Sequence, residues 1–386
     1  MRRYATRRSA PPDDGRIPDE PERLRWNRAG HPVYPGPRFT LLSACVAEPT
    51  ATTKPVDADP STGPTTGATS DTTPTPTAPP TDADTDTGTV PGTTDTAPVD
   101  LGPQVDRSDP ALRELEFTAL DADSEATVEL GVELAALDTR VAPIGRLVVY
   151  LHGAGSYSSC GAYDHAEMLG ALGFHVFMPC YVAGYGVDNC GDDIGGCRLE
   201  AFEGVDHHTL IDVEPPDAIE RRVVRGLQHL QAIDPGGDWQ YFLDGELPRW
   251  DHIVISGISH GASSSGLIAK FRTVDRAVML SGPLDTDQQW LVDPSVTPID
   301  RFRGFTHTDD DQHTGHLAAY DDLGLVGAPV FVDGVAPPYD GSHRLESSAA
   351  TSSGHESTQA GWASPLDPSG GWLFQPVWTQ LYTGSP

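Results

Sequence analysis

A short apolar run that ends in a glycine-flanked serine limits the fold of this chain more than any other stretch. Residues 252–256 read HIVIS, residues 257–261 read GISHG, and residues 262–271 read ASSSGLIAKF. The first run is typical of a buried strand, and the last is typical of a helix whose small residues pack closely against a sheet. A strand that meets a helix through G-x-S-x-G places its serine on a sharp turn at the end of the strand. We therefore expect Ser259 to lie on such a turn.

Segments with strand and helix character alternate on both sides of this turn. Residues 145–153 (GRLVVYLHG) form a continuous apolar run, which is typical of a parallel strand that is covered on both faces. Residues 216–233 carry apolar residues at helical spacing. Further strand candidates are 112–120, 125–137, 174–179, 276–282, 301–307 and 328–334, and further helix candidates are 163–173 and 374–384. This alternation predicts an α/β sheet, with the first two strands antiparallel at one edge.

Composition divides the chain into three parts. Residues 48–101 consist almost entirely of Thr, Pro, Asp, Gly, Ala and Ser and contain no aromatic residue. Such a segment buries too little apolar area to offset its ordering entropy, so it predicts a disordered linker. The linker separates an atypical N-terminal region, residues 1–47, from residues 102–386, which are long enough for one folded domain. The net charge of −31 argues against nucleic acid as a partner.

Four of the five cysteines lie in the expected folded domain, at positions 160, 180, 190 and 197. They contain no C-x-x-C pair, which favours disulfides over a zinc site. We expect Cys190 to pair with Cys197 across the polar loop GDDIGG, and Cys160 to pair with Cys180, although the sequence leaves all three connectivities open. Disulfides predict that the protein matures in an oxidising, extracytoplasmic compartment.

The fifth cysteine, Cys45, ends the stretch Leu-Ser-Ala-Cys, residues 42–45. This stretch resembles a bacterial lipoprotein box. The resemblance implies lipidation of Cys45 and a lipid anchor that holds the domain at a membrane surface through the linker. The four downstream cysteines by themselves predict export to the periplasm, the cell surface or the medium.

A second strand end supports the interpretation of Ser259 as a nucleophile. Residues 150–156 read YLHGAGS. Together with GISHG, this stretch resembles the α/β-hydrolase superfamily over residues 147–386, and in particular poorly characterised bacterial secreted serine hydrolases and esterases. The resemblance implies that the backbone N–H groups of His260 and Ala154 form an oxyanion hole beside Ser259.

The same resemblance carries further expectations about the fold. It implies an α/β-hydrolase fold with a mostly parallel sheet that is covered on both faces. Residues 181–215 and 283–300 interrupt the alternation of strands and helices, so we expect these inserted loops to form a cap over the site. The resemblance implies neither a metal nor an organic cofactor.

In this superfamily the acid and the histidine follow the nucleophile in that order. Three consecutive aspartates, 309–311, come directly after the strand candidate 301–307. We expect Asp310 to be the acid, with Asp309 as the alternative. Two histidines follow the last strand candidate; we expect His355 to be the base, with His343 as the alternative.

The acid-rich stretch also has a metal interpretation. Residues 307–316 read HTDDDQHTGH and place His313 and His316 three positions apart. Metal ligands occur at such spacings, but no third ligand group stands out, so we expect no metal there.

These expectations describe a serine hydrolase, most simply a carboxylesterase or lipase-like enzyme that forms an acyl-enzyme through Ser259, Asp310 and His355. Its partner would be a small-molecule or polymeric ester, and the protein would act as a monomer. Two alternatives remain open. One is a non-catalytic surface lipoprotein that uses the fold for binding; the other is a transacylase or peptidase of the same fold, because chemistry depends on the pocket rather than on the fold.

Overall fold

The computed structural model describes residues 25–26, 32–33, 100–155 and 159–385. The chain divides into two units, Met1–Pro91 and Gly92–Pro386. In the first unit, the strands β1 (Arg25–Trp26) and β2 (Pro32–Val33) pair antiparallel. Cys45 and residues 48–99 of the expected linker lie outside the described residues, so lipidation and the linker stay predictions.

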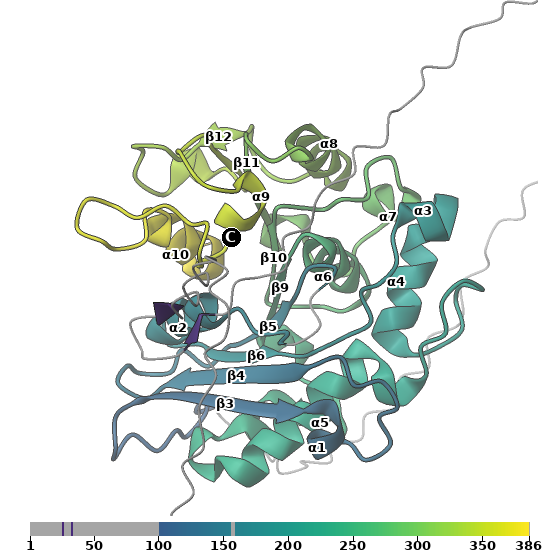
Figure 1. Cartoon of the computed structure of the whole chain (residues 1–386), viewed down its shortest axis with the longest axis vertical. Coiled ribbons are helices and arrows are strands. Elements are labelled where there is room, and N and C mark those ends of the chain that lie inside the picture. Colours follow the sequence, from purple (N-terminus) through teal and green to yellow (C-terminus); the bar gives the residue numbers. More distant parts are fainter. Residues whose placement is uncertain (1–24, 27–31, 34–99, 156–158, 386) are drawn as a thin grey trace, which may run out of the picture. The chain divides into compact units, whose positions relative to one another are not determined.

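Within residues 100–385, a nine-stranded sheet has the order β12-β13-β11-β10-β9-β5-β6-β4-β3 (Figure 1). Its strands are β3 (Leu112–Thr118), β4 (Val132–Asp138), β5 (Leu147–Leu151), β6 (His175–Met178), β9 (Ile253–Ile258), β10 (Arg276–Leu280), β11 (Phe302–His307), β12 (Val330–Phe331) and β13 (Arg344–Ser347). β4 is antiparallel to both β3 and β6, and the other neighbouring pairs are parallel. The expected mostly parallel sheet of an α/β fold, with antiparallel strands at one edge, is confirmed.

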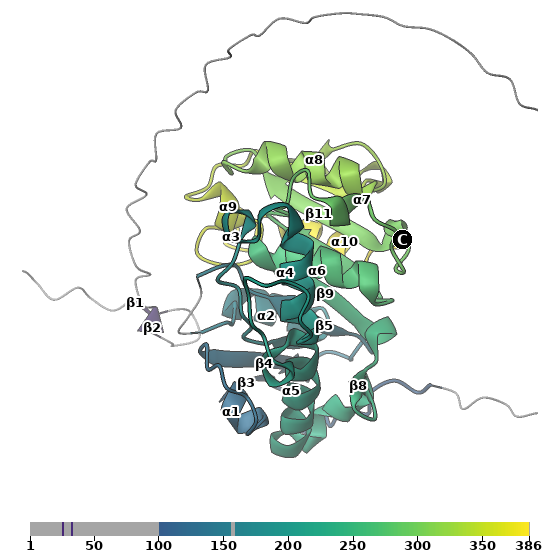
Figure 2. The same ribbon diagram turned by 90° about the vertical axis from the view of Figure 1, so that its right-hand side faces the viewer.

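Helices cover both faces of this sheet (Figures 1 and 2). One face packs against α4 (Ile194–Glu203), α5 (Ile219–Ile233), α6 (His260–Phe271) and α8 (His313–Leu323). The other face packs against α2 (Tyr163–Ala171) and α10 (Gln375–Thr383). Each residue of β5, β9 and β10 is buried, which explains why these strands read as continuous apolar runs rather than as alternating ones.

The two inserted loops pack on the α6 side of the sheet. Residues 181–215 contain α3 (Val187–Cys190) and α4, and α4 lies alongside α6 (Figure 2). Residues 283–300 contain α7 (Gln289–Val292). A buried ion pair joins the two loops, because Arg198 of α4 donates two hydrogen bonds to Asp285, at 2.5 and 2.6 Å. A short hairpin of β7 (Leu243–Asp244) and β8 (Leu247–Pro248) and the one-turn helix α1 (Ala119–Ala122) complete the lower end of the domain in Figure 2.

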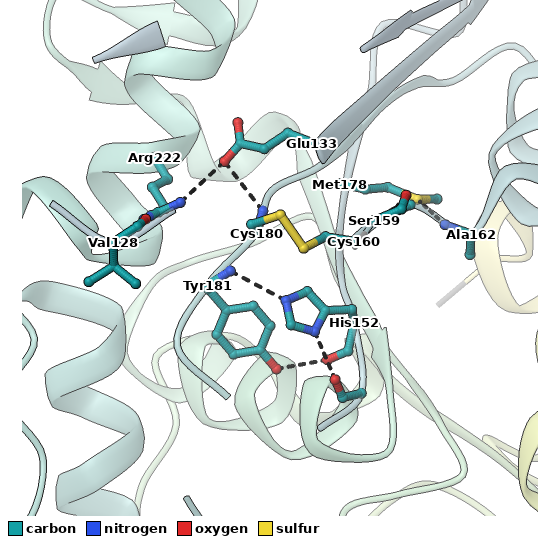
Figure 3. Close-up of a disulfide and its surroundings, with 12 residues drawn as sticks. Val128, Glu133, His152, Ser159, Cys160, Ala162, Met178, Cys180, Tyr181 and Arg222 are labelled. Carbon is teal, nitrogen blue, oxygen red and sulfur yellow. Dashed lines mark hydrogen bonds and ion pairs between the residues drawn. A yellow bond between two sulfur atoms is a disulfide. The ribbon is translucent and has the colours of Figure 1, made fainter. Parts of the chain in front are cut away.

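The structure joins the four cysteines of the domain in two disulfides. Cys160 pairs with Cys180 and Cys190 pairs with Cys197. The first links the segment after β5 to the end of β6 (Figure 3), and the second closes the short loop between α3 and α4. In the described residues, no helix has both the length and the apolar character that a membrane span requires.

These pairings predict the thiol content of the mature protein. Protein recovered from its native host should show no free thiol at the four positions, and non-reducing peptide maps should contain the pairs 160–180 and 190–197. Mass spectrometry after alkylation without reduction measures both. Four alkylated cysteines in that experiment would contradict maturation in an oxidising compartment.

Candidate active site

Ser259 lies on the sharp turn between β9 and α6. Its backbone has φ 57° and ψ −120°, a conformation that non-glycine residues rarely adopt. Its N–H donates to the carbonyl of Leu280, at the end of β10, which fixes the turn on the sheet. The side chain is half-buried, and among the described residues no group hydrogen-bonds to its Oγ. The turn therefore places the hydroxyl of Ser259 at the carboxyl end of the sheet, where it makes no hydrogen bond that would stabilise the described part of the fold.

The two glycines of GISHG are required by close backbone contacts. A Cβ on Gly257 would lie 2.5 Å from the carbonyl oxygen of Leu151, and a Cβ on Gly261 would lie 2.0 Å from the same atom. No side chain fits at these distances. The turn therefore packs directly against the end of β5. This contact brings residues 152–155, the HGAG stretch that follows β5, next to Ser259.

Both expected oxyanion donors are placed beside this turn. A Cβ built on Gly153 would be 3.4 Å from the Cβ of Ser259, so the Gly153–Ala154 segment borders the serine. Ala154 itself is exposed. His260 is the first residue of α6, and the first N–H groups of a helix have no partner within the helix. That these two N–H groups bind a negatively charged oxygen beside Ser259 stays a prediction.

Asp310 and His355 form a hydrogen-bonded pair. Nδ1 of His355, in the one-turn helix α9 (Gly354–Ser357), lies 2.8 Å from Oδ2 of Asp310, so Nδ1–H donates to the carboxylate and Nε2 is left as an acceptor. Asp310 is buried, and its Oδ1 accepts the N–H of Gln312. Asp309, the alternative acid, is exposed, and its backbone N–H donates to Nδ1 of His307.

The pairing shifts the pKa values of both groups. Burial alone would lower the pKa of His355, but the hydrogen bond and the charge of Asp310 outweigh it and raise that pKa. Burial alone would raise the pKa of Asp310, but the hydrogen bond from His355 and its charge leave that pKa lowered. Asp310 is therefore ionised at neutral pH and stabilises the imidazolium form of His355.

The loop after β10 holds the histidine and the serine turn together. Ser281 Oγ donates to the carbonyl of His355, at 2.7 Å, and a Cβ on the next residue, Gly282, would lie 3.1 Å from the carbonyl oxygen of Ser259. On the other side, a Cβ on Gly354 would lie 2.5 Å from the backbone nitrogen of Asp310. Sequence reasoning missed Ser281, because a single serine after a strand carries no spacing pattern that marks it.

The structure places the alternative histidine elsewhere. His343 immediately precedes β13 and accepts the N–H of Gly304 at its carbonyl, so it lies at the amino edge of the sheet, opposite to Ser259. Burial and the nearby charge of Arg303 lower the pKa of His343 to about 4. It is not brought together with Asp310 or Ser259.

His313 and His316, the two histidines considered as metal ligands, contact side chains of the neighbouring strands and of Asp310. Thr306 Oγ1 contacts Nδ1 of His316 at 2.8 Å, and burial lowers the pKa of His316 to about 4. Nε2 of His313 lies 3.4 Å from Glu346. Among the described residues, the group of potential metal ligands that lie within 4.8 Å of one another is Cys190, Cys197 and His208, and its two sulfurs form a disulfide.

Solved structures that resemble this chain include two distant likenesses from one organism. No family model matches the sequence, and neither does any curated protein. Fluorophosphonate-binding serine hydrolase F of Staphylococcus aureus, solved with bound substrate, is 13% identical, with a TM-score of 0.35 over 62% of this chain and 91% of that one. The apo S-formylglutathione hydrolase of Staphylococcus aureus is 12% identical, with a TM-score of 0.36 over 64% and 92%. The fold described above rests on strand order and pairing, independently of these likenesses.

Proposed function

We propose that this chain is a serine hydrolase that cleaves carboxylic esters with Ser259 as nucleophile, His355 as base and Asp310 as acid. The observation that carries the proposal is the strained turn at Ser259, which places a hydroxyl that bonds to none of the described residues at the sheet end where a paired histidine and aspartate also lie. Strain of this kind is retained where the surrounding structure enforces it, and it is concentrated at functional sites.

In the proposed mechanism, Oγ of Ser259 attacks the ester carbonyl carbon while Nε2 of His355 takes the hydroxyl proton. The carbonyl oxygen becomes an oxyanion that accepts hydrogen bonds from the N–H groups of His260 and Ala154. The carbon–oxygen bond to the alcohol then breaks, and His355 returns the proton to the departing alcohol. Asp310 keeps the proton of His355 on Nδ1 throughout.

Water completes the cycle. His355 takes a proton from a water molecule that attacks the acyl carbon. The second oxyanion then collapses, the bond between the acyl carbon and Oγ of Ser259 breaks, and His355 returns the proton to Oγ as the free acid leaves. Ser259 and His355 are not hydrogen-bonded in this structure; such catalytic contacts often tighten only when substrate is bound. We also propose that the domain matures outside the cytoplasm, which its two disulfides support.

The proposed function is tested by a panel of p-nitrophenyl esters whose acyl chains increase in length. We expect turnover of at least one ester, with a burst of nitrophenol equal to one equivalent of enzyme if deacylation is the slower step. Product analysis in the presence of an alcohol or amine separates hydrolysis from acyl transfer. Absence of turnover across the panel and with peptide substrates would favour a binding role instead.

The raised pKa of His355 predicts the pH dependence of the reaction. The base must be neutral, so kcat/KM should rise with pH through a pKa above the ordinary value for histidine. Asp310→Asn removes the charge that raises this pKa, so the rising limb should move to lower pH while the plateau falls. A pH profile of both proteins measures the shift. A limb that stays in place in the variant would show that Asp310 does not set the pKa of the base.

A further inference from the structure

Behind the serine turn, three buried side chains form a continuous series of hydrogen bonds. Nη1 of Arg198, in the first inserted loop, lies 3.2 Å from Nε2 of His260. Nδ1 of His260 lies 2.9 Å from the hydroxyl of Tyr181, and that hydroxyl lies 2.9 Å from the carbonyl oxygen of His152. The three side chains belong to residues that are at most 2% exposed. The series therefore runs from the inserted loop to the HGAG stretch.

The guanidinium of Arg198 and the carbonyl of His152, at the two ends of the series, fix the direction of every hydrogen bond between them. A guanidinium can only donate, so Nε2 of His260 accepts from Arg198, and the proton of the neutral ring is on Nδ1. Nδ1–H then donates to the oxygen of Tyr181, which leaves the tyrosine hydroxyl to donate to the carbonyl of His152. Burial, followed by the charge of Arg198, lowers the pKa of His260 strongly, which keeps the ring neutral as this arrangement requires.

Two members of the series, His260 and His152, belong to the two halves of the proposed oxyanion hole. His260 carries one donor on its own backbone, and His152 is two residues before Ala154, which carries the other. Tyr181 holds His152 at a second point, because its backbone N–H donates to Nε2 of His152, at 3.3 Å (Figure 3). Nδ1–H of His152 in turn donates to the carbonyl of Gly153, at 2.7 Å. Each of these bonds restricts the backbone that leads to Ala154.

Neighbouring groups anchor the series on both sides. Asp285 holds Arg198 through two hydrogen bonds and also accepts the indole N–H of Trp290, at 2.9 Å. Next to Tyr181, the disulfide of Cys180 with Cys160 ties the end of β6 to the segment that follows Ala154 (Figure 3). The hydroxyl of Tyr181 therefore connects His260, whose partner Arg198 is held by Asp285, to His152, which precedes the segment held by the disulfide.

We propose that Tyr181, together with Arg198 and the imidazole of His260, is a positioning residue that sets the relative placement of the two oxyanion donors. This inference rests on the proposed function. A misplacement of catalytic groups by about 1 Å costs up to about a hundredfold in rate. The link through Tyr181 would prevent such a misplacement, because it holds the two N–H groups at a fixed separation.

The test is Tyr181→Phe, which removes the hydroxyl and keeps the ring packed. We expect kcat to fall on the order of ten- to a hundredfold with KM within about twofold of its original value, because the donors act on the transition state. Inhibition by a trifluoromethyl ketone, whose serine adduct carries an oxyanion, should weaken by the same factor as kcat/KM. Inhibition by the carboxylic acid product, which forms no such adduct, should be unchanged.

Tyr185→Phe is the matched control. It removes the same atom from a neighbouring buried tyrosine whose hydroxyl bonds neither His260 nor His152, and whose ring packs edge-on against His260 with the two ring centres 4.6 Å apart. We expect its kcat within about twofold of the unmodified enzyme. Melting curves of both variants verify that they are folded at the assay temperature.

The outcomes separate this inference from the function on which it rests. An unmodified protein that turns over no ester would refute the proposed function before any variant is compared. If the unmodified protein is active, a Tyr181→Phe variant with unchanged kcat overturns the inference. So does an equal loss in both variants, or a loss confined to KM, because either would show that the hydroxyl contributes packing rather than positioning.

Discussion

Ser259→Ala should abolish ester hydrolysis and leave the domain folded. We expect kcat to fall on the order of a millionfold, as for the removal of a serine nucleophile in a triad. The hydroxyl makes no hydrogen bond among the described residues and is half-buried, so its loss should change the melting temperature little. Steady-state assays on the most reactive ester, with a thermal melt of each protein, measure both effects.

A serine in the same helix gives the control for this variant. Ser265 is buried in α6, and its Oγ is already engaged, because it donates to the carbonyl of Gly261 at 2.8 Å. Ser265→Ala should keep kcat within about tenfold. If Ser259→Ala retained more than about one part in a thousand of the turnover, the remaining activity would have to come from another nucleophile, and the assignment would be wrong.

The second large effect concerns the two histidines. His355→Ala should lose turnover to about the same extent as Ser259→Ala, because the two groups act as one unit. Asp310→Asn should lose on the order of ten-thousandfold, since the amide does not hold the imidazole in the required tautomer. His343→Ala should change kcat little, because His343 lies at the opposite edge of the sheet.

His343 is buried, so its variant is expected to melt at a lower temperature even though its activity is retained. Assays are therefore run below the melting transition of every variant. Exchange of the results for His343 and His355 would make His343 the base. Full activity in both variants would show that neither histidine takes the serine proton.

The sequence allowed the fold to be predicted because the central strands are covered on both faces, whereas the roles of Ser259, Asp310 and His355 stay predictions. Such strands read as mostly apolar runs, and β5, β9 and β10 are each recognisable from them. β13 was not recognisable. Its residues, RLES, include two charged side chains, and it becomes a strand because it pairs with both β11 and β12. For that reason the sequence alone left His343 as an alternative base.

The contacts that hold the residues of the candidate site in place could not be predicted from the sequence. Arg198 meets Asp285 across 87 positions, and Tyr181 meets His260 across 79. Neither contact leaves a local pattern, because each depends on how the inserted loops fold back on α6. Ser281 is a similar case, since its bond to the carbonyl of His355 joins two loops that are 74 positions apart. Local periodicity identifies elements, but it does not identify which distant side chains meet.

The most direct test of the central claim is to map the site of covalent labelling by a fluorophosphonate probe on the folded, disulfide-bonded protein. The probe reacts with activated serine nucleophiles, so we expect one equivalent to be incorporated, and tandem mass spectrometry should locate it on Ser259. Labelling should be lost in Ser259→Ala and strongly slowed in His355→Ala. Adduct on a different residue, or ester hydrolysis that continues with Ser259 unlabelled after prolonged exposure, would contradict the assignment of Ser259 as the nucleophile.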